Sequence, residues 1–107
     1  MSEMQVTMDE FEEAAKVAID SIPPAFQPYL ENTQFILEEG SPRGLMGLYE
    51  GGGAFSAGAW LPERITLYKR GHEHAAESWD ELVEEVRRTI LHEVGHHFGM
   101  DEPEMPF

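Results

Sequence analysis

The sequence predicts a small α+β fold, and three observations indicate it. Residues 8–21, and the residues from Ser78 toward Gly99, each carry apolar side chains at helical spacing behind a capping residue. Between them, residues 33–38, 45–50 and 64–70 have the composition of strands and are bounded by glycine and proline. A chain of 107 residues is long enough for one core and too short for a second. We therefore predict a single domain, 1–107, with a short mixed or antiparallel sheet, a backing helix and a C-terminal helix.

The first helix is predicted from its cap and its apolar stripe. Thr7 is a plausible N-cap, and Glu10 stands three residues later, which completes a capping box. The next apolar residues recur every three or four positions, and Pro23 and Pro24 end the helix. The stripe comprises Phe11, Ala14, Ala15, Ala18 and Ile22.

The three strands differ in how clearly the sequence marks them. Residues 33–38 are rich in strand-forming side chains and are closed by a Gly-Ser-Pro turn at 40–42. Residues 45–50 form the second candidate and run into three glycines. Residues 64–70 alternate two faces and are the clearest strand. Between the last two strands, a stretch rich in glycine and alanine predicts a long loop or an irregular sheet edge.

The final helix is the best-marked element. Ser78 is its predicted N-cap, and Glu81 completes a second capping box. Its predicted core stripe places the histidines of the last turns at the margin of the buried face, where a helix borders a cleft. The stripe comprises Leu82, Val83, Val86, Ile90 and Val94.

Composition limits the possible partners. Seven basic and 21 acidic residues give a formal net charge of −14, which disfavours nucleic acid and anionic membranes as partners. The chain has no cysteine, so any metal must be held by nitrogen and oxygen ligands. No apolar run approaches the roughly 20 residues of a membrane span, and the first residues do not resemble a signal peptide. We expect a cytoplasmic monomer.

The pattern H-E-x-x-H at residues 92–96 points to metal chemistry. Residues four apart share a face of a helix, so His92 and His96 can direct two imidazoles at one metal ion. Glu93 lies about 100° further round the helix. It therefore flanks the metal, where a general base for an activated water has to stand.

The residues after the motif predict a third ligand. Gly99 lies where the helix must end, and a left-handed residue there reverses the chain at little steric cost. In the extended zinc-helix pattern the third ligand comes three residues after that glycine, which is Glu102. Asp101 is the competing carboxylate. His97 lies near the core face, so we interpret it as a packed histidine.

A second histidine pair, His72 and His74, is spaced two residues apart. This spacing shares a face on a strand but not on a helix. No third ligand stands nearby in the sequence. We therefore interpret the pair as part of a solvated loop.

On these motifs the chain resembles the small bacterial zincin-like metallopeptidases, also called minimal zincins or minigluzincins. The matching segments are residues 48–51 (LYEG), 61–70 (LPERITLYKR) and 88–99 (RTILHEVGHHFG). The resemblance implies a minimal zincin-like core with a short twisted sheet, a backing helix and an active-site helix. It also implies a bound Zn²⁺. The family usually has aspartate at the third-ligand position, where this chain has Glu102.

Two functions follow from these patterns. The first is zinc-dependent hydrolysis of a peptide or protein substrate, with His92, His96 and Glu102 as metal ligands and Glu93 as general base. The second is a zinc-binding or interaction module without catalysis, because a small domain gains stability from a bound metal.

Overall fold

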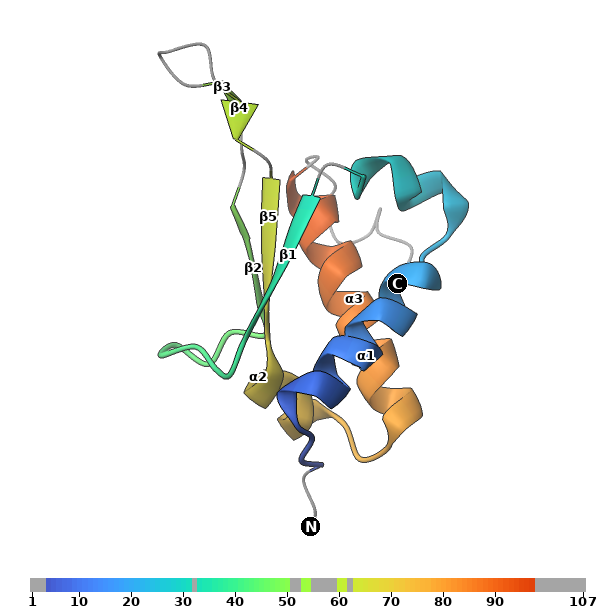
Figure 1. Ribbon diagram of the computed structural model, residues 1–107, viewed down its shortest axis with the longest axis vertical. Helices are drawn as coiled ribbons and strands as arrows, with labels where there is room; N and C mark the ends of the chain where they lie inside the picture. The colour runs from blue at the N-terminus through green and yellow to red at the C-terminus, as the bar shows by residue number, and fades with distance from the viewer. Residues whose placement is uncertain (1–3, 32, 51–52, 55–59, 62, 98–107) are drawn as a thin grey trace.

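The computed structural model describes residues 4–31, 33–50, 53–54, 60–61 and 63–97. For Tyr29, His96, His97 and the segments 53–54 and 60–61, it describes the backbone alone. The helices and strands follow one another along the chain as shown in Figure 1. They are α1 (Met8–Asp20), the 3₁₀ helix η1 (Pro24–Tyr29), β1 (Thr33–Glu38), β2 (Gly47–Glu50), β3 (Gly53–Ala54), β4 (Trp60–Leu61), β5 (Glu63–Tyr68), α2 (Lys69–Ala75) and α3 (Trp79–His97).

The sheet is mixed and has β5 at its centre. The strand order is β1-β5-β2, with β1 parallel and β2 antiparallel to β5. In this register, Phe35 of β1 and Tyr49 of β2 both lie beside Ile65 of β5. The short strands β3 and β4 pair with each other and extend beyond one end of the larger sheet (Figure 1).

The core lies between the sheet and the helices α1 and α3, which share one face of it (Figure 1). Residues of the two predicted helical stripes are buried, except that Val83 is only partly so. Ile65 and Leu67 of the central strand are fully buried against them. Each such side chain contributes about 1.5–3 kcal/mol by leaving water, which makes this layer the main source of stability.

The helix starts largely follow the predicted caps. Thr7 and Glu10 form the predicted capping box at α1, with both reciprocal hydrogen bonds present. At α3, the Glu81 amide donates to the Ser78 hydroxyl as predicted (3.2 Å). The Glu81 carboxylate instead accepts from the amide of Glu77, one residue before the predicted partner (2.8 Å).

The loop predicted around His72 and His74 is wrong. The chain enters helix α2 directly at Lys69, so the strand predicted to reach residue 70 ends at Tyr68. His72 is fully buried, whereas His74 is exposed. The two-residue spacing did not reveal that one histidine of the pair would point into the core.

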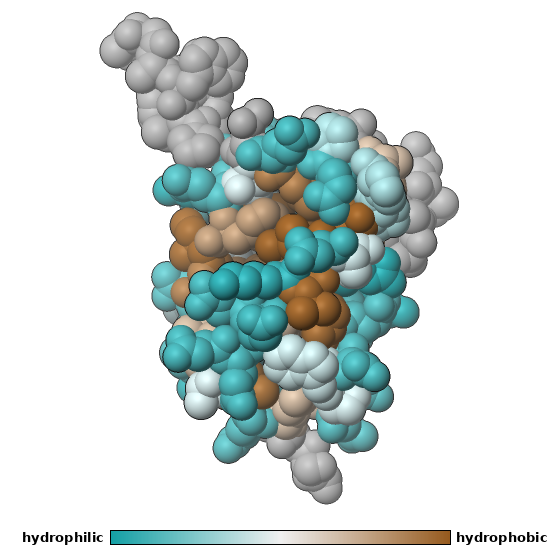
Figure 2. Space-filling model, turned by 45° about the vertical axis from the view of Figure 1, so that its right-hand side comes forward, coloured by the Kyte–Doolittle hydropathy of each residue, from teal (hydrophilic) through white to brown (hydrophobic). Residues whose placement is uncertain are grey.

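None of the described helices is long and apolar enough to cross a membrane. Hydrophilic side chains cover much of the face shown in Figure 2, with hydrophobic ones gathered near its middle. Several hydrophobic side chains are only partly buried against the core, among them Phe35, Leu37 and Ile19.

Candidate metal centre and active site

The H-E-x-x-H residues lie in the last turns of α3. The helix is continuous to His97, so His92 and His96 are one turn apart, about 6 Å along the axis. His92 is half-buried. The backbone thus provides the helical spacing that two imidazole ligands require.

Glu93 is held by the neighbouring strand. Its Oε1 atom accepts a hydrogen bond of 3.1 Å from the backbone N–H of Tyr49 in β2. Within the part of the chain that the structure describes, its Oε2 atom has no hydrogen-bond partner. The carboxylate is therefore oriented through one oxygen, and the other can accept a proton.

The pairing of β2 explains why the Tyr49 amide is available. The Tyr68 amide donates to the Met46 carbonyl (2.9 Å), which sets the alternation of the antiparallel ladder. Residues 46, 48 and 50 therefore direct their backbone groups toward β5. Gly47 and Tyr49 direct theirs away from β5, toward the edge of the sheet next to α3. Among the described residues no further strand pairs with this edge, which we call the free edge.

The contact between β2 and α3 is unusually close at Gly47. A Cβ atom on this glycine would lie 2.5 Å from Cγ2 of Thr89, 3.4 Å from the Thr66 carbonyl oxygen and 3.7 Å from Cγ of Glu93. Thr89 stands one helical turn before Glu93, so both face the same strand. The missing side chain of Gly47 lets the helix approach the edge strand.

The hydroxyl of Thr89, whose methyl group faces Gly47, is hydrogen-bonded to a buried histidine of α2. His72 of α2 lies 2.8 Å from the Tyr68 carbonyl through Nδ1 and 2.9 Å from the Thr89 hydroxyl through Nε2. Its ring also contacts Phe11, with centroids 5.5 Å apart. Burial lowers the pKa of His72, so the ring is neutral near pH 7. Because a carbonyl only accepts, we assign the ring proton to Nδ1. The single proton of the Thr89 hydroxyl is then shared between His72 Nε2 and the backbone carbonyl of Glu85, which lies 3.0 Å away.

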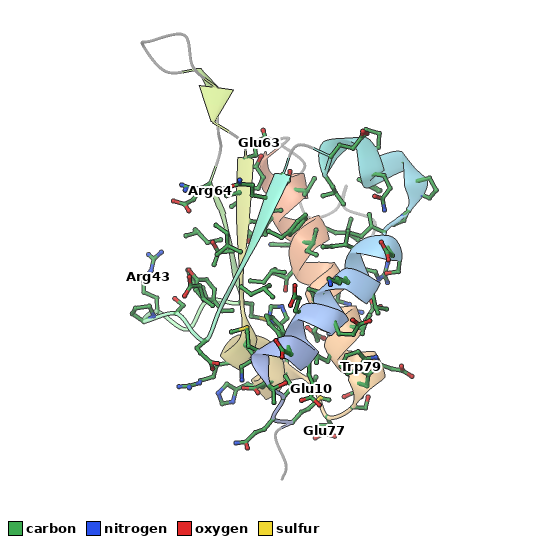
Figure 3. All side chains as sticks on the ribbon, viewed as in Figure 1. Glu10, Arg43, Glu63, Arg64, Glu77 and Trp79 are labelled. Atoms are coloured by element: carbon green, nitrogen blue, oxygen red, sulfur yellow. The ribbon has the colours of Figure 1, made fainter. Side chains whose placement is uncertain are left out.

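The side chain of Tyr49 lies on the helix-facing side of the sheet, in register with Ile65. Its hydroxyl oxygen is buried. Burial, and then the neighbouring Glu63 carboxylate, raise the pKa of this phenol, so it remains protonated. Glu63 and Arg64 begin β5, at the end of the sheet away from α2 (Figure 3). Arg64 forms an ion pair of 3.5 Å with Glu50 across β5 and β2.

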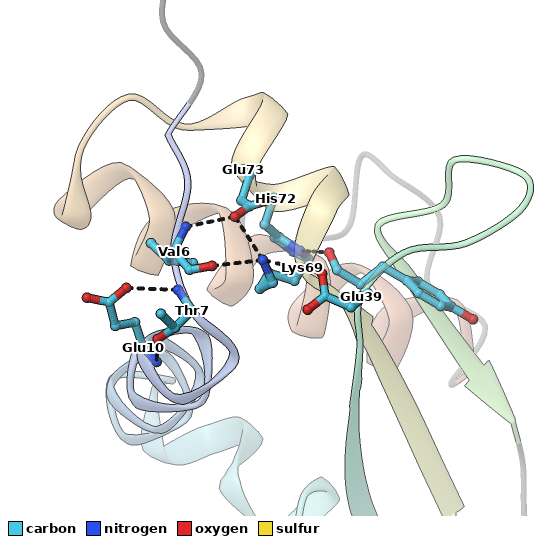
Figure 4. A network of polar contacts seen from close by, with 8 residues as sticks. Val6, Thr7, Glu10, Glu39, Lys69, His72 and Glu73 are labelled. Atoms are coloured by element: carbon cyan, nitrogen blue, oxygen red, sulfur yellow. Dashed lines mark hydrogen bonds and ion pairs between the residues drawn. The ribbon is translucent and has the colours of Figure 1, made fainter.

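A second polar cluster lies at the opposite end of the sheet (Figure 4). The Lys69 ammonium contacts the Glu73 carboxylate (3.0 Å), the Val6 carbonyl (2.8 Å) and Glu39 (3.4 Å). The Val6 amide also donates to Glu73 (2.8 Å). Burial lowers the pKa of Lys69, but Glu73 and Glu39 outweigh it and the net shift is upward. This cluster fastens the segment before α1 to α2.

The residues present fit a zinc ion in their donor chemistry. The helix backbone places two histidines one turn apart, and the carboxylate of the adjacent Glu93 is bonded to β2. No group of three metal-binding side chains occurs among the residues whose side chains are described. The predicted third ligand Glu102, its competitor Asp101 and the turn at Gly99 lie outside the described residues, as does the side chain of His97. The ligand set therefore stays a prediction.

The family comparison agrees with this architecture. The model of the zincin-like metallopeptidase family matches residues 30–106, and the chain belongs to this family. As the resemblance implied, the described helices and sheet form a small α+β fold consistent with a minimal zincin-like domain.

Among solved structures, the chain is similar to a conserved hypothetical protein from Thermus thermophilus. The two sequences are 26% identical, and the match covers 86% of this chain and 94% of the other, with a TM-score of 0.60. No curated protein matches the sequence.

Three residues near the motif were not found from the sequence. Tyr49 and Thr89 lay in segments that match the family but were given no role of their own, and Gly47 was predicted only as a strand residue. Their importance depends on the register of β2 against α3, which no local pattern specifies. The one available signal was the glycine inside a predicted strand, which often marks a close backbone approach.

Proposed function

We propose that this protein is a zinc-dependent peptidase. The observation that carries the proposal is the position of Glu93, next to His92 on α3 and bound through one oxygen to the edge of the sheet. Membership in the zincin-like metallopeptidase family supports the same chemistry.

His92, His96 and one carboxylate, Glu102 by its spacing, would hold the zinc ion. Two neutral imidazoles and a carboxylate without thiolates suit zinc well. When bound, zinc polarises the scissile carbonyl and makes a water molecule more acidic.

Glu93 supplies the proton transfers. Its Oε2 accepts a proton from the attacking water and later passes it to the leaving amine. The Tyr49 amide fixes the carboxylate through Oε1, so the reacting oxygen does not have to be ordered at each turnover.

The substrate would be an extended peptide. The backbone carbonyls of Gly47 and Tyr49 face the free edge of β2, as its pairing with β5 requires. An extended peptide can bind such an edge through backbone hydrogen bonds, with little selection among side chains.

A specific observation also favours the second candidate, a zinc-binding module without catalysis. Glu93 has a structural partner in the Tyr49 amide, so its presence beside the histidines does not require a catalytic role. A metal on α3 would then stabilise a small domain.

The substitution Glu93→Gln separates the two candidates. Glutamine keeps a carbonyl oxygen that can accept from Tyr49, but it cannot take a proton from water. We expect the variant to keep its fold and its zinc and to lose turnover by at least about 100-fold, the scale of general-base catalysis. Zinc content, circular dichroism and cleavage of an unstructured peptide library would be measured in parallel. Equal activity in wild type and variant would exclude Glu93 as the base.

A further inference from the structure

Four contacts form a closed ring between the edge strand and the metal-binding helix. The ring runs from the Met46 carbonyl to the Tyr68 amide, and from the Tyr68 carbonyl to His72. It continues from His72 to the Thr89 hydroxyl and closes where Cγ2 of Thr89 meets Gly47, the neighbour of Met46. The ring thus joins β2, β5, α2 and α3.

Helix α2 is fixed to the same point of the chain. A Cβ atom on Gly71 would lie 3.1 Å from Cγ of Met46 and 3.2 Å from the Leu45 carbonyl oxygen. Gly71 therefore packs closely against the residues just before β2. This contact limits the movement of the next residue, His72, whose side chain bonds Thr89. The ring members Thr89 and His72 are both buried, so water does not compete for their hydrogen bonds.

We propose that Gly47, Thr89 and His72 are positioning residues that set the distance between α3 and β2 so that Glu93 stays bound to the Tyr49 amide. This inference rests on the proposed function for its catalytic consequence. The geometry itself does not depend on that function, because the bond between Glu93 and Tyr49 joins two residues of the fold directly.

The expected consequence follows from the space at Gly47. A methyl group at this position would overlap Cγ2 of Thr89, so α3 or β2 must shift. A displacement of about 1 Å at a reacting group can lower turnover by about 100-fold. The pairing with β5 holds β2 in place, so we expect α3 to be the element that moves. A peptide on the strand edge would then meet the same backbone groups of β2, so kcat should fall more than KM rises.

The test is the variant Gly47→Ala and its rescue by Thr89→Ser. Serine lacks the Cγ2 methyl that the new Cβ would meet but keeps the hydroxyl that bonds His72. The double variant therefore restores the space while leaving the ring chemically intact. Gly40→Ala is the matched control, since a Cβ there would make an ordinary contact of 3.5 Å with Cβ of Arg70.

The first readout is hydrogen exchange of the Tyr49 amide, measured by NMR, with Glu93→Ala as the reference for a lost bond. We expect Gly47→Ala to exchange at least about tenfold faster than wild type and the double variant to recover most of the protection. Gly40→Ala should match wild type. Wild-type protection in Gly47→Ala, or no recovery in a folded double variant, would overturn the proposal.

The second readout is peptidase turnover. Gly47→Ala should lose at least about tenfold in kcat with a change in KM below about threefold, and Thr89→Ser should reverse it. If the wild type cleaves no peptide, the proposed function fails, and the amide-exchange experiment alone tests whether Gly47, Thr89 and His72 are positioning residues.

If Gly47→Ala does not fold, Thr89→Val replaces it, because valine removes the hydroxyl that bonds His72. Unchanged protection of Tyr49 in that variant would also contradict the proposal.

Discussion

Replacing Lys69 with methionine should strongly destabilise the protein. Lys69 and Glu73 are 7% and 8% exposed, and their charged atoms are 3.0 Å apart. The Val6 amide donates one hydrogen bond to Glu73, but only the ammonium compensates the charge of the carboxylate at this distance. Methionine keeps much of the apolar stem and removes that compensating charge.

The expected loss is about 3–5 kcal/mol, the usual effect of leaving one charge of a buried pair uncompensated. At about 4 °C per kcal/mol for a domain of this size, the melting temperature should fall by roughly 12 °C or more. Burial raises the pKa of Glu73, but Val6, Lys69 and Arg70 outweigh it and the net shift is downward. The contribution of Glu73 is therefore present above about pH 4.3 and is lost as the pH falls through its lower folded-state pKa.

Thermal and urea unfolding of three variants would measure this effect at pH 7. Lys16→Met is the matched control, because its partner Glu12 is 3.9 Å away and both side chains are more than half exposed. That substitution should change stability by less than about 1 kcal/mol. Adding Glu73→Gln to Lys69→Met removes the stranded charge and should recover a large part of the loss. If Lys69→Met costs less than about 1 kcal/mol, the Lys69–Glu73 pair, which binds Val6, does not stabilise the attachment of the segment before α1 to α2.

Three further outcomes follow from the site. His92→Ala and His96→Ala should each lose zinc by elemental analysis, and full zinc occupancy in both would exclude them as ligands. Glu102→Ala should weaken zinc binding more than Asp101→Ala does, because Glu102 is the predicted direct ligand. Asp101 would only orient the turn or a ligand histidine, a role worth about 10–100-fold in affinity. Zinc titration of both variants decides between the two residues. Burial lowers the pKa of His72 in the folded protein, so as the pH falls the unfolded state takes up a proton on this histidine at a higher pH than the folded state does. Metal-free protein should therefore lose stability as the pH falls below about 6.5. Urea unfolding of His72→Gln should show a weaker pH dependence below about pH 6.5, and an equal slope in both proteins would contradict this assignment.

Much of the fold was predictable because its elements have local signals. The capping box at Thr7 and the apolar stripe behind it predicted the position of α1, and both were confirmed. The strand over residues 33–38 has the predicted bounds. The strand predicted over 64–70 begins one residue earlier and ends two residues earlier, at Tyr68. Nothing local indicates that Lys69 and Arg70 start a helix, since their alternation also continues the strand.

The site was predictable only along one element. The spacing of His92 and His96 is a property of a single helix, and the structure places both on α3. The partner of Glu93 depends instead on how β2 lies against that helix, and 44 positions separate Glu93 from Tyr49. A shift of one residue in the register of β2 would turn the Tyr49 amide toward β5 and remove this partner.

The same contact explains why a motif on one helix does not by itself define an enzyme. The hydrogen bond between Glu93 and Tyr49 is compatible with two roles for Glu93. It can be a general base or a structural tie, that is, a carboxylate that only joins α3 to β2, because both roles need a carboxylate near the strand edge. The difference lies in the second oxygen, which a structural tie leaves unused and a base must expose to water. Gly47 bears on that difference, since the close approach that it permits brings Glu93 to the edge where a peptide would bind. A helix that only held a metal would tolerate a methyl group at Gly47 if the fold adjusted, whereas a peptidase would lose turnover before it lost its zinc.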